Sequence, residues 1–292
     1  MIDALPSLAL DLARDVVIGF VALALALRVS LALFCALSHL RYASYLRHKG
    51  ETVPIRGFAV LRAIAREVRA IVRLVRASPT FLFDGYRLGR SRHTGVPVVC
   101  VHGYTQNGTN FFSMRRALER KGHATYAPSL GLPLVPVDEH AKLLERAIER
   151  AVARSDAGSR FAIVAHSMGG LVVRRLFALK SELALRCDVV VTIGTPHRGT
   201  AGARGFPIGP DVRAMQRGSP FLATLPDLAA TCPHARRVEI AGRVDWVVYP
   251  LSTSLTPGAE HVVLEKPGHA GLLVDDDVTR LVLDALADPR PR

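Results

Sequence analysis

The chain has 292 residues, of which 49% are hydrophobic and 22% are charged, and its formal net charge is +13 at pH 7. This composition excludes a disordered tail and suffices for one large domain with an additional segment. Aromatic residues make up only 6% of the chain and are not interleaved with the basic ones, so we predict no nucleic-acid partner. Residues 1–95 carry 14 basic and 6 acidic side chains, which makes a membrane lipid surface the better candidate partner.

Residues 16–37 form the first predicted element, an apolar helix interrupted only by Arg28 and Ser30. At about 1.5 Å per residue, 22 residues could cross a hydrocarbon core of about 30 Å. A central arginine costs about 2.5 to 3.5 kcal/mol, which the surrounding apolar side chains offset if Arg28 reaches headgroups or a partner. We therefore predict a membrane anchor, with a buried or interfacial helix as the alternative. A cleaved signal peptide fits less well, because the residues ahead of the run are net acidic.

Residues Leu61 to Arg76 form the second predicted element, a strongly amphipathic helix. Two stripes alternate along it at steps of three and four: the apolar residues Leu61, Ile64, Val68, Ile71 and Val75, and the basic residues Arg62, Arg66, Arg69, Arg73 and Arg76. Such a helix can lie in the headgroup layer of an anionic membrane. The alternative is a solvated arginine face over an ordinary core contact. Ser78 and Pro79 are expected to end the helix.

After Gly95 the pattern changes to short β-rich runs separated by helical segments, which is typical of an alternating α/β domain. Several of these runs are continuously apolar, as in strands of a parallel sheet with helices on both faces. The six candidate strands are Val98–Val101, Thr125–Ala127, Phe161–Ala165, Val189–Ile193, Arg237–Ala241 and His261–Leu264. We predict one catalytic domain over residues 93–292, preceded by an anchor over 1–50 and a basic helix and linker over 51–92.

The third candidate strand runs directly into Ala165-His166-Ser167-Met168-Gly169-Gly170 and then into a helical run from Leu171 to Lys180. A serine on such a sharp strand-to-helix turn projects its hydroxyl above the sheet, provided that the flanking residues are small. Ala165 stands where the usual G-x-S-x-G pattern has its first glycine, and a methyl group is tolerable there. Ser167 is therefore the candidate nucleophile.

Three other strand ends carry matching motifs. His102-Gly103-Tyr104 follows the first strand, and its backbone N–H groups could face a developing oxyanion. Gly194-Thr195-Pro196-His197-Arg198-Gly199-Thr200 follows the fourth strand. Asp245 lies just past the fifth strand and His269 just past the sixth, so the chain order is serine, acid, histidine.

With these motifs the sequence resembles the α/β-hydrolase family, and within it bacterial lipases and esterases with Ala-x-Ser-x-Gly at the nucleophile. The resemblance covers about residues 96–285, and the N-terminal layout and Met215–Pro220 are similar to those of membrane-anchored proteobacterial members. It implies an α/β-hydrolase fold with a mostly parallel six-stranded sheet. It also implies ester hydrolysis by Ser167, Asp245 and His269, with the N–H groups of Tyr104 and Met168 as the oxyanion hole.

The chemistry of the residues agrees with these roles. A serine hydroxyl is a poor nucleophile at neutral pH, so His269 must take its proton and Asp245 must orient the imidazole. Competing assignments remain for the acid, at Asp227 or the run 275–277, and for the base, at His261 or His234. We expect His102, His166 and His197 to order loops around the site.

Two further features stay open in the sequence. Residues 201–235 are a long, partly apolar stretch between the fourth and fifth strands, which either caps the active site or forms ordinary helices packed on the sheet. Cys187 and Cys232 precede strands that are neighbours in this family, so they could form a disulfide. Cys35 and Cys100 complete the set, and no Cys or His spacing suggests a metal site or redox chemistry.

The sequence therefore predicts a serine hydrolase that acts on apolar acyl esters at or near a membrane, with no cofactor and no metal. Thioester hydrolysis, acyl transfer and a catalytically silent binding protein are the alternatives. Basic residues follow the apolar run whereas only Arg14 precedes it, so the positive-inside rule places the catalytic domain on the cytoplasmic side of a bacterial inner membrane. The sequence does not indicate an oligomeric state.

Overall fold

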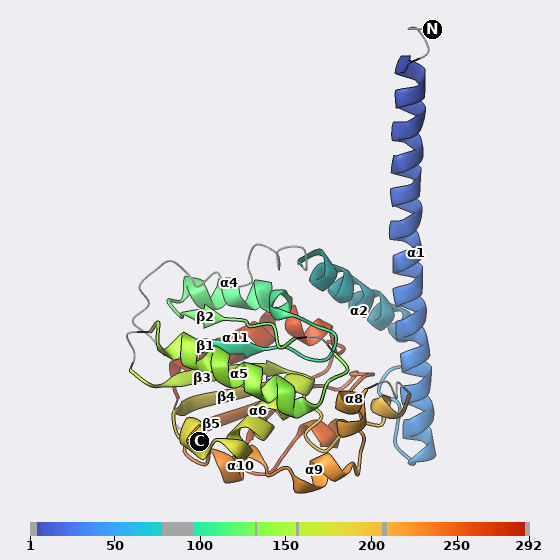
Figure 1. Ribbon diagram of the computed structural model, residues 1–292. Coiled ribbons are helices and arrows are strands. Elements are labelled where there is room, and N and C mark those ends of the chain that lie inside the picture. The colour runs from blue at the N-terminus through green and yellow to red at the C-terminus, as the bar shows by residue number, and fades with distance from the viewer. Residues whose placement is uncertain (1–4, 78–95, 132, 156–157, 206–208, 290–292) are drawn as a thin grey trace.

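The computed structural model describes residues 5–77, 96–131, 133–155, 158–205 and 209–289 (Figure 1). Its centre is a six-stranded sheet in the order β2-β1-β3-β4-β5-β6, in which every neighbouring pair is parallel. The strands are β1 (Val98–Val101), β2 (Thr125–Tyr126), β3 (Phe161–His166), β4 (Cys187–Ile193), β5 (Arg236–Gly242) and β6 (Glu260–Leu264). All six predicted strands are confirmed; β1 has the predicted ends, and the ends of the others differ by at most two residues.

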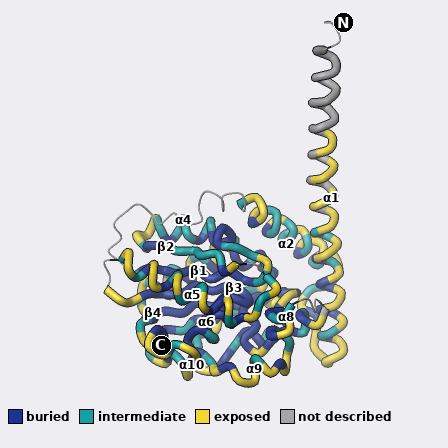
Figure 2. The backbone as a smooth tube through the Cα atoms, viewed as in Figure 1, coloured by how far each residue is buried: buried dark blue, intermediate teal, exposed yellow. Residues whose placement is uncertain are grey.

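Helices cover both faces of this sheet, as the continuously apolar strands predict. On one face α5 (Val137–Val152) and α6 (Met168–Leu179) pack on Val99 and Val101 of β1. On the other face α4 (Phe112–Arg120) and α11 (Asp276–Ala287) share a core with Val98 and Cys100. Alternate residues of one strand thus enter opposite cores, and the central strands are buried throughout (Figure 2).

The segment between β4 and β5 consists of short helices. They are a 3-10 helix (Gly202–Gly205), α8 (Pro210–Ala214), α9 (Pro220–Thr224) and α10 (Leu228–Thr231). Met215, Leu225 and Leu228 are buried in the same core as α5 and α6. The position of these side chains agrees with the second interpretation of this stretch, in which its helices pack on the sheet. Residues 206–208 lie outside the described part.

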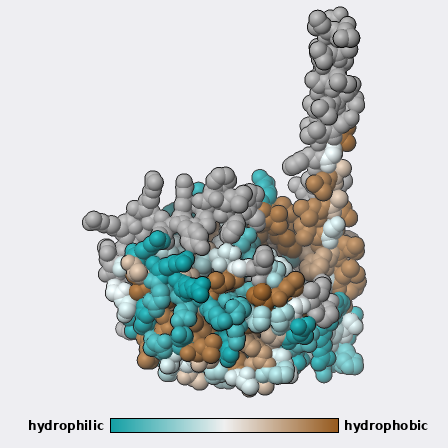
Figure 3. Space-filling model, in the orientation of Figure 1, coloured by the Kyte–Doolittle hydropathy of each residue, from teal (hydrophilic) through white to brown (hydrophobic). Residues whose placement is uncertain are grey.

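The N-terminal helix α1 (Leu5–His48) projects far from the sheet, and its C-terminal half packs on the domain (Figure 1). There Cys35, Tyr42 and Leu46 form a small core with Trp246 and Tyr249, which follow β5. Hydrophobic side chains are exposed along α1 and around its junction with α2 (Figure 3).

The predicted transmembrane anchor over residues 16–37 is unsupported. In the part of the chain that the structure describes, we find no helix with the length and apolar character needed to cross a membrane. The side chain of Arg28 lies outside that part.

The predicted amphipathic helix is confirmed as α2 (Phe58–Ala77), but its buried stripe differs from the prediction. The buried residues are Ala63, Glu67, Ala70 and Leu74, whereas Leu61 is 60% exposed. The helix thus buries two alanines, one leucine and one carboxylate, whereas Leu61 and Val75 of the predicted apolar stripe are exposed. Its predicted end at Ser78 and Pro79 lies outside the described residues.

The sequence left open whether Cys187 and Cys232 form a disulfide, and in the structure all four cysteines are free and buried. Each of these two thiols has a backbone acceptor: Cys187 Sγ donates to Val189 O at 3.4 Å and Cys232 Sγ donates to Leu228 O at 3.2 Å. Burial raises the pKa of Cys232 to about 11, so its thiol is protonated at neutral pH. These side chains act as small buried hydrophobic residues.

Candidate active site

Ser167 occupies the turn between β3 and α6, with φ 55° and ψ −129°. A non-glycine residue rarely adopts this backbone conformation, and the strain is characteristic of a nucleophile on a strand-to-helix elbow. The turn is close-packed on its neighbours, because a Cβ atom at Gly169 would lie 2.4 Å from Val101 O and one at Gly170 would lie 2.3 Å from Thr195 Oγ1. These contacts explain why glycines follow Ser167 and Met168.

The structure brings the three predicted side chains together at the carboxyl ends of β3, β5 and β6. Ser167 Oγ lies 3.0 Å from His269 Nε2, and His269 Nδ1 lies 2.7 Å from Asp245 Oδ2. The other carboxylate oxygen, Asp245 Oδ1, accepts hydrogen bonds from Val247 N and Val248 N, both at 2.8 Å. Asp245 is therefore fixed by its own turn, and the imidazole lies between the acid and the hydroxyl.

His269 is largely, but not fully, buried, and acidic side chains lie near it. Burial acts to lower its pKa, but the charge of Asp245 and the hydrogen bond to it, together with the charge of Glu67, raise the pKa above the ordinary value. An imidazole held in this way is stabilised as an imidazolium, which is the state it must enter after accepting a proton.

The glycine of the Gly-Thr-Pro motif makes room for this pair. Gly194 follows β4 with φ 56°, and a Cβ atom there would lie 3.3 Å from both Asp245 Oδ2 and His269 Nδ1. A side chain at this position would be strained and would crowd the hydrogen bond. The glycine of this motif therefore leaves the space in which Asp245 and His269 form their hydrogen bond.

The predicted oxyanion loop lies against the serine. A Cβ atom at Gly103 would lie 2.8 Å from Ser167 Cβ, so only glycine fits there. Gly103 N donates to Gln106 Oε1 at 2.9 Å, which fixes the loop just before Tyr104. Met168 N belongs to the first turn of α6, where N–H groups face outward along the helix axis. The assignment of Tyr104 N and Met168 N as oxyanion donors stays a prediction.

Two residues of the site gave no signal in the sequence. Gln106 connects the oxyanion loop to the elbow, because its Oε1 also lies 2.9 Å from His166 Nδ1. Glu67 reaches the histidine loop from α2, and its carboxylate accepts hydrogen bonds from the backbone directly after His269. Neither belongs to a motif, and both contacts join segments far apart in the chain.

The competing acids and bases have other partners. Asp227 forms an ion pair with Arg174 at 2.8 Å, and Asp275 accepts from Asp277 N at the start of α11. His261 Nε2 donates to Thr256 O at 2.7 Å. These contacts direct all three side chains elsewhere and leave Asp245 as the acid on His269.

The other histidines of the sequence motifs, His102, His166 and His197, order the surrounding loops. Leu130 N donates to His102 Nε2, so His102 Nδ1 carries the hydrogen that is donated to Gly103 O. His197 contacts Thr192 Oγ1 at 3.0 Å, and His166 Nε2 lies 3.2 Å from His269 O. Burial lowers the pKa of His102 to about 4 and that of His197 to about 3, so both are neutral at pH 7.

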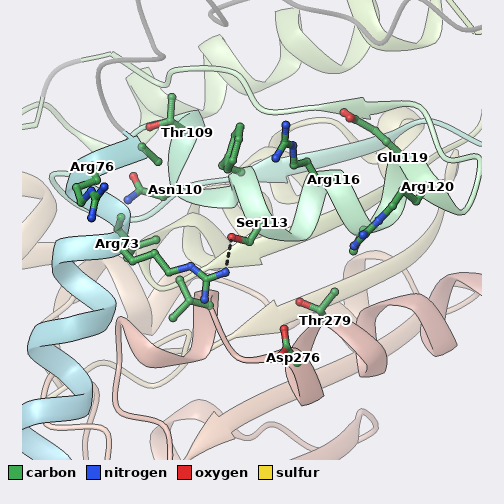
Figure 4. Close-up of a pocket in the computed structure, with 15 residues that line it drawn as sticks. Arg73, Arg76, Thr109, Asn110, Ser113, Arg116, Glu119, Arg120, Asp276 and Thr279 are labelled. Carbon is green, nitrogen blue, oxygen red and sulfur yellow. Dashed lines mark hydrogen bonds between the residues drawn. The ribbon is translucent and has the colours of Figure 1, made fainter.

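A groove of about 970 Å³ lies apart from these residues, between α2, α4 and α11 (Figure 4). It is basic, with the guanidinium groups of Arg73, Arg76, Arg116 and Arg120 around it. No residue of the Ser167, Asp245 and His269 set lines it. Within the described residues no cluster of His, Cys, Asp or Glu could hold a metal ion.

A protein-family profile and several solved structures match this chain. The profile of the "Alpha/beta hydrolase family" matches residues 98–291. Among solved structures, Bacillus licheniformis lipase BlEst2 in its mature form has a TM-score of 0.56 at 16% identity, over 69% of this chain and 96% of that one. Aspergillus fumigatus lipase B has a TM-score of 0.60 at 17% identity, over 72% of this chain and 57% of that one.

A third neighbour is a putative non-heme bromoperoxidase from Mycobacterium tuberculosis, with a TM-score of 0.53 at 16% identity over 68% of this chain and 94% of that one. At these identities the neighbours share the fold with this chain, and their printed activities differ among themselves. No curated protein sequence matches the chain. The geometry of the site itself must therefore carry any statement about chemistry.

The buried histidines predict how stability depends on pH. The unfolded chain takes up protons on His102 and His197 below about pH 6.5, whereas the folded chain resists this until about pH 4 and 3. Stability should be complete above pH 6.5 and fall as the pH drops, by about 1.4 kcal/mol per pH unit for each histidine. His269, whose pKa is raised, contributes stability that is fully present below about pH 6.5 and is lost as the pH rises above that value, so it leaves the slope at lower pH unchanged.

Urea unfolding between pH 7 and pH 5 measures the effect, and a His102→Gln variant should show a shallower slope. A midpoint that is constant over this range would contradict the assignment of buried neutral histidines.

Proposed function

The chain belongs to the alpha/beta hydrolase family, and from this membership and the geometry of the site we propose that it is a serine ester hydrolase of the lipase or esterase type. The observation that carries the proposal is the continuous hydrogen-bonded path from Asp245 Oδ2 through His269 to Ser167 Oγ, with contacts of 2.7 and 3.0 Å. Its substrate is an apolar acyl ester, and its intermediate is an acyl-enzyme on Ser167.

The mechanism uses each residue where it lies. His269 Nε2 accepts the proton of Ser167 as the hydroxyl oxygen attacks the acyl carbonyl, and Asp245 stabilises the imidazolium. Backbone N–H groups at Tyr104 and Met168 would stabilise the oxyanion, each by about 3 to 4 kcal/mol. His269 then donates its proton to the leaving alcohol. Water, activated by the same imidazole, hydrolyses the acyl-enzyme and restores Ser167.

Thioester hydrolysis and acyl transfer would use the same three residues, and a protein that only binds acyl esters would use none of them. A panel of p-nitrophenyl esters, triglyceride, phospholipid and acyl thioesters separates the catalytic alternatives. Esters are the proposed class because two of the structural neighbours are described as lipases.

Ser167→Ala should abolish ester turnover and covalent labelling by a fluorophosphonate, because removal of Oγ leaves no nucleophile at the elbow. The variant should stay folded, since the alanine methyl fits the space of the Ser167 Cβ and His269 keeps Asp245. Gel fluorescence and peptide mass spectrometry measure the labelling. Labelling of another serine in the variant would show that the nucleophile lies elsewhere.

Loss of the acid and loss of the base should lower kcat by different amounts. From the behaviour of serine triads, His269→Ala should lower kcat by roughly 10⁶-fold and Asp245→Ala by roughly 10⁴-fold. Asp227→Asn is the control and should stay near the wild-type rate, because its carboxylate pairs with Arg174. Since the pKa of His269 is raised and the neutral imidazole is the base, kcat/KM should rise with pH about a midpoint above 6.5. Full activity of Asp245→Ala would refute this assignment.

A second part of the proposal concerns where the enzyme acts, and the charge on α2 supports an anionic lipid surface. Arg62, Arg69, Arg73 and Arg76 are exposed on this helix, and Arg116 and Arg120 extend the basic surface across the groove. Exposed apolar side chains lie on α1 and at the start of α2, among them Leu33, Leu37, Leu40, Phe58 and Leu61. The cytoplasmic leaflet of a membrane carries a negative surface potential, so this basic surface favours the cytoplasmic face of a bacterial inner membrane.

Arg69→Gln combined with Arg76→Gln should weaken binding to phosphatidylglycerol vesicles, because each arginine near the surface contributes about 1 kcal/mol and the pair therefore about thirtyfold. The matched control is Arg146→Gln with Arg150→Gln, two exposed arginines on α5 at the opposite face of the sheet. Vesicle flotation measures binding, which should also decrease with added salt. Equal binding to neutral phosphatidylcholine vesicles, or equal losses in both pairs, would contradict an electrostatic lipid site.

A further inference from the structure

Helix α2 carries one acidic side chain, Glu67, and it is on the buried face of the helix. Only 6% of the residue is exposed. A carboxylate without partners is costly to bury, so a buried one is expected to accept strong hydrogen bonds. The position of Glu67 among the alanines and the leucine of the buried stripe therefore requires an explanation.

The partners are two successive backbone N–H groups of the histidine loop. Glu67 Oε1 accepts from Ala270 N at 2.6 Å, and Oε2 accepts from Gly271 N at 3.1 Å. These are the two residues directly after His269. The carboxylate thus uses one oxygen on each donor and fixes the backbone that carries the imidazole.

The residue before His269 is shaped for the same carboxylate. A Cβ atom at Gly268 would lie 2.5 Å from Glu67 Oε2, so any other residue at this position would displace the carboxylate. Contacts on both sides of His269 in the chain therefore converge on one side chain from another helix.

Three groups face the imidazole from three different elements. Asp245 approaches from the loop after β5, Glu67 from α2, and His166 from the end of β3 with ring centroids 4.7 Å apart. The pKa of Glu67 is raised above its ordinary value, chiefly by burial and also by the charge of Asp245, whereas the N–H groups of Ala270 and Gly271 and the charge of His269 act to lower it. The loop therefore carries hydrogen-bond donors that favour the ionised carboxylate over the neutral acid.

We propose that Glu67 is a positioning residue for the base: by holding the backbone at Ala270 and Gly271, it keeps the His269 imidazole between Asp245 and Ser167. The inference rests on the proposed function of His269 as the base. Glu67 contacts the backbone of the loop and reaches the reacting atoms only through it. Residue 67 also lies outside the family match at 98–291. A segment that precedes the matched domain therefore helps to order the active site.

The test compares Glu67→Gln with Glu51→Gln in the full-length chain. Both variants exchange a carboxylate for an amide in the N-terminal helical segment, but Glu51 is exposed in the turn after α1. In Glu67→Gln an amide NH₂ group must face one of the two backbone donors. For a soluble p-nitrophenyl ester we expect kcat to fall about tenfold with KM unchanged, and the control to match the wild type.

An NMR titration of His269 provides a readout that does not require turnover. Because the charge of Glu67 raises the pKa of His269, the pKa of His269 should be lower in Glu67→Gln than in the wild type. If the wild type is not labelled by a fluorophosphonate, the proposed function fails while this titration still tests the contact between Glu67 and His269. Wild-type kcat together with a wild-type pKa of His269 in Glu67→Gln would overturn the positioning role.

Gly268→Ala keeps the inference testable if Glu67→Gln folds poorly. The added methyl group would displace the carboxylate without removing its charge, so kcat should fall with KM unchanged here as well. Because both substitutions act on one contact, the loss in the double variant should be smaller than the product of the two single losses. Independent, multiplicative losses would show that the two positions act separately and would contradict the proposal.

Discussion

The hydrogen bonds on the two nitrogens of His269 are the constraint on which the rest of the site depends. They join a serine that is 102 residues away in the chain to an acid that is 24 residues away. The parallel sheet makes this geometry attainable, because the carboxyl ends of β3, β5 and β6 open on the same edge. Three features next to the imidazole support these hydrogen bonds. The turn after Asp245 fixes its carboxylate, Gly194 leaves space for the Asp245–His269 pair, and the elbow presents the Ser167 hydroxyl.

The N-terminal helices belong to this constraint as much as the sheet does. Tyr42 Oη of α1 donates to Arg243 O at 2.8 Å, two residues before Asp245. Trp246, directly after Asp245, packs edge-on against His39 with ring centroids 5.1 Å apart. Helix α1 thus contacts the loop of the acid, and α2 contacts the loop of the base through Glu67. The segment for which the sequence favours a membrane anchor and a basic helix thus packs on both loops.

Most of the fold and the Ser167, Asp245 and His269 set could be predicted, because local patterns carry them. Continuous apolar runs mark β1, β3 and β4, and glycines flank the turns where the chain approaches itself closely. Glu67 could not be predicted, since its partners lie 203 and 204 residues away and a lone glutamate on an arginine-rich helix suggests an exposed side chain. The sequence could not decide whether Cys187 and Cys232 pair, because the order of the strands indicates only that the two residues are near each other and does not show that each thiol has a backbone acceptor.

The central claim is that Ser167 becomes covalently acylated, and rapid quenching of the reaction followed by peptide mass spectrometry tests it most directly. During turnover of a p-nitrophenyl ester, the account predicts that the acyl group is found on the peptide that contains Ser167, and that it is lost at the rate of deacylation. Turnover with no acylated peptide at any quench time would contradict the account, because water would then attack the ester without the nucleophile that the elbow presents.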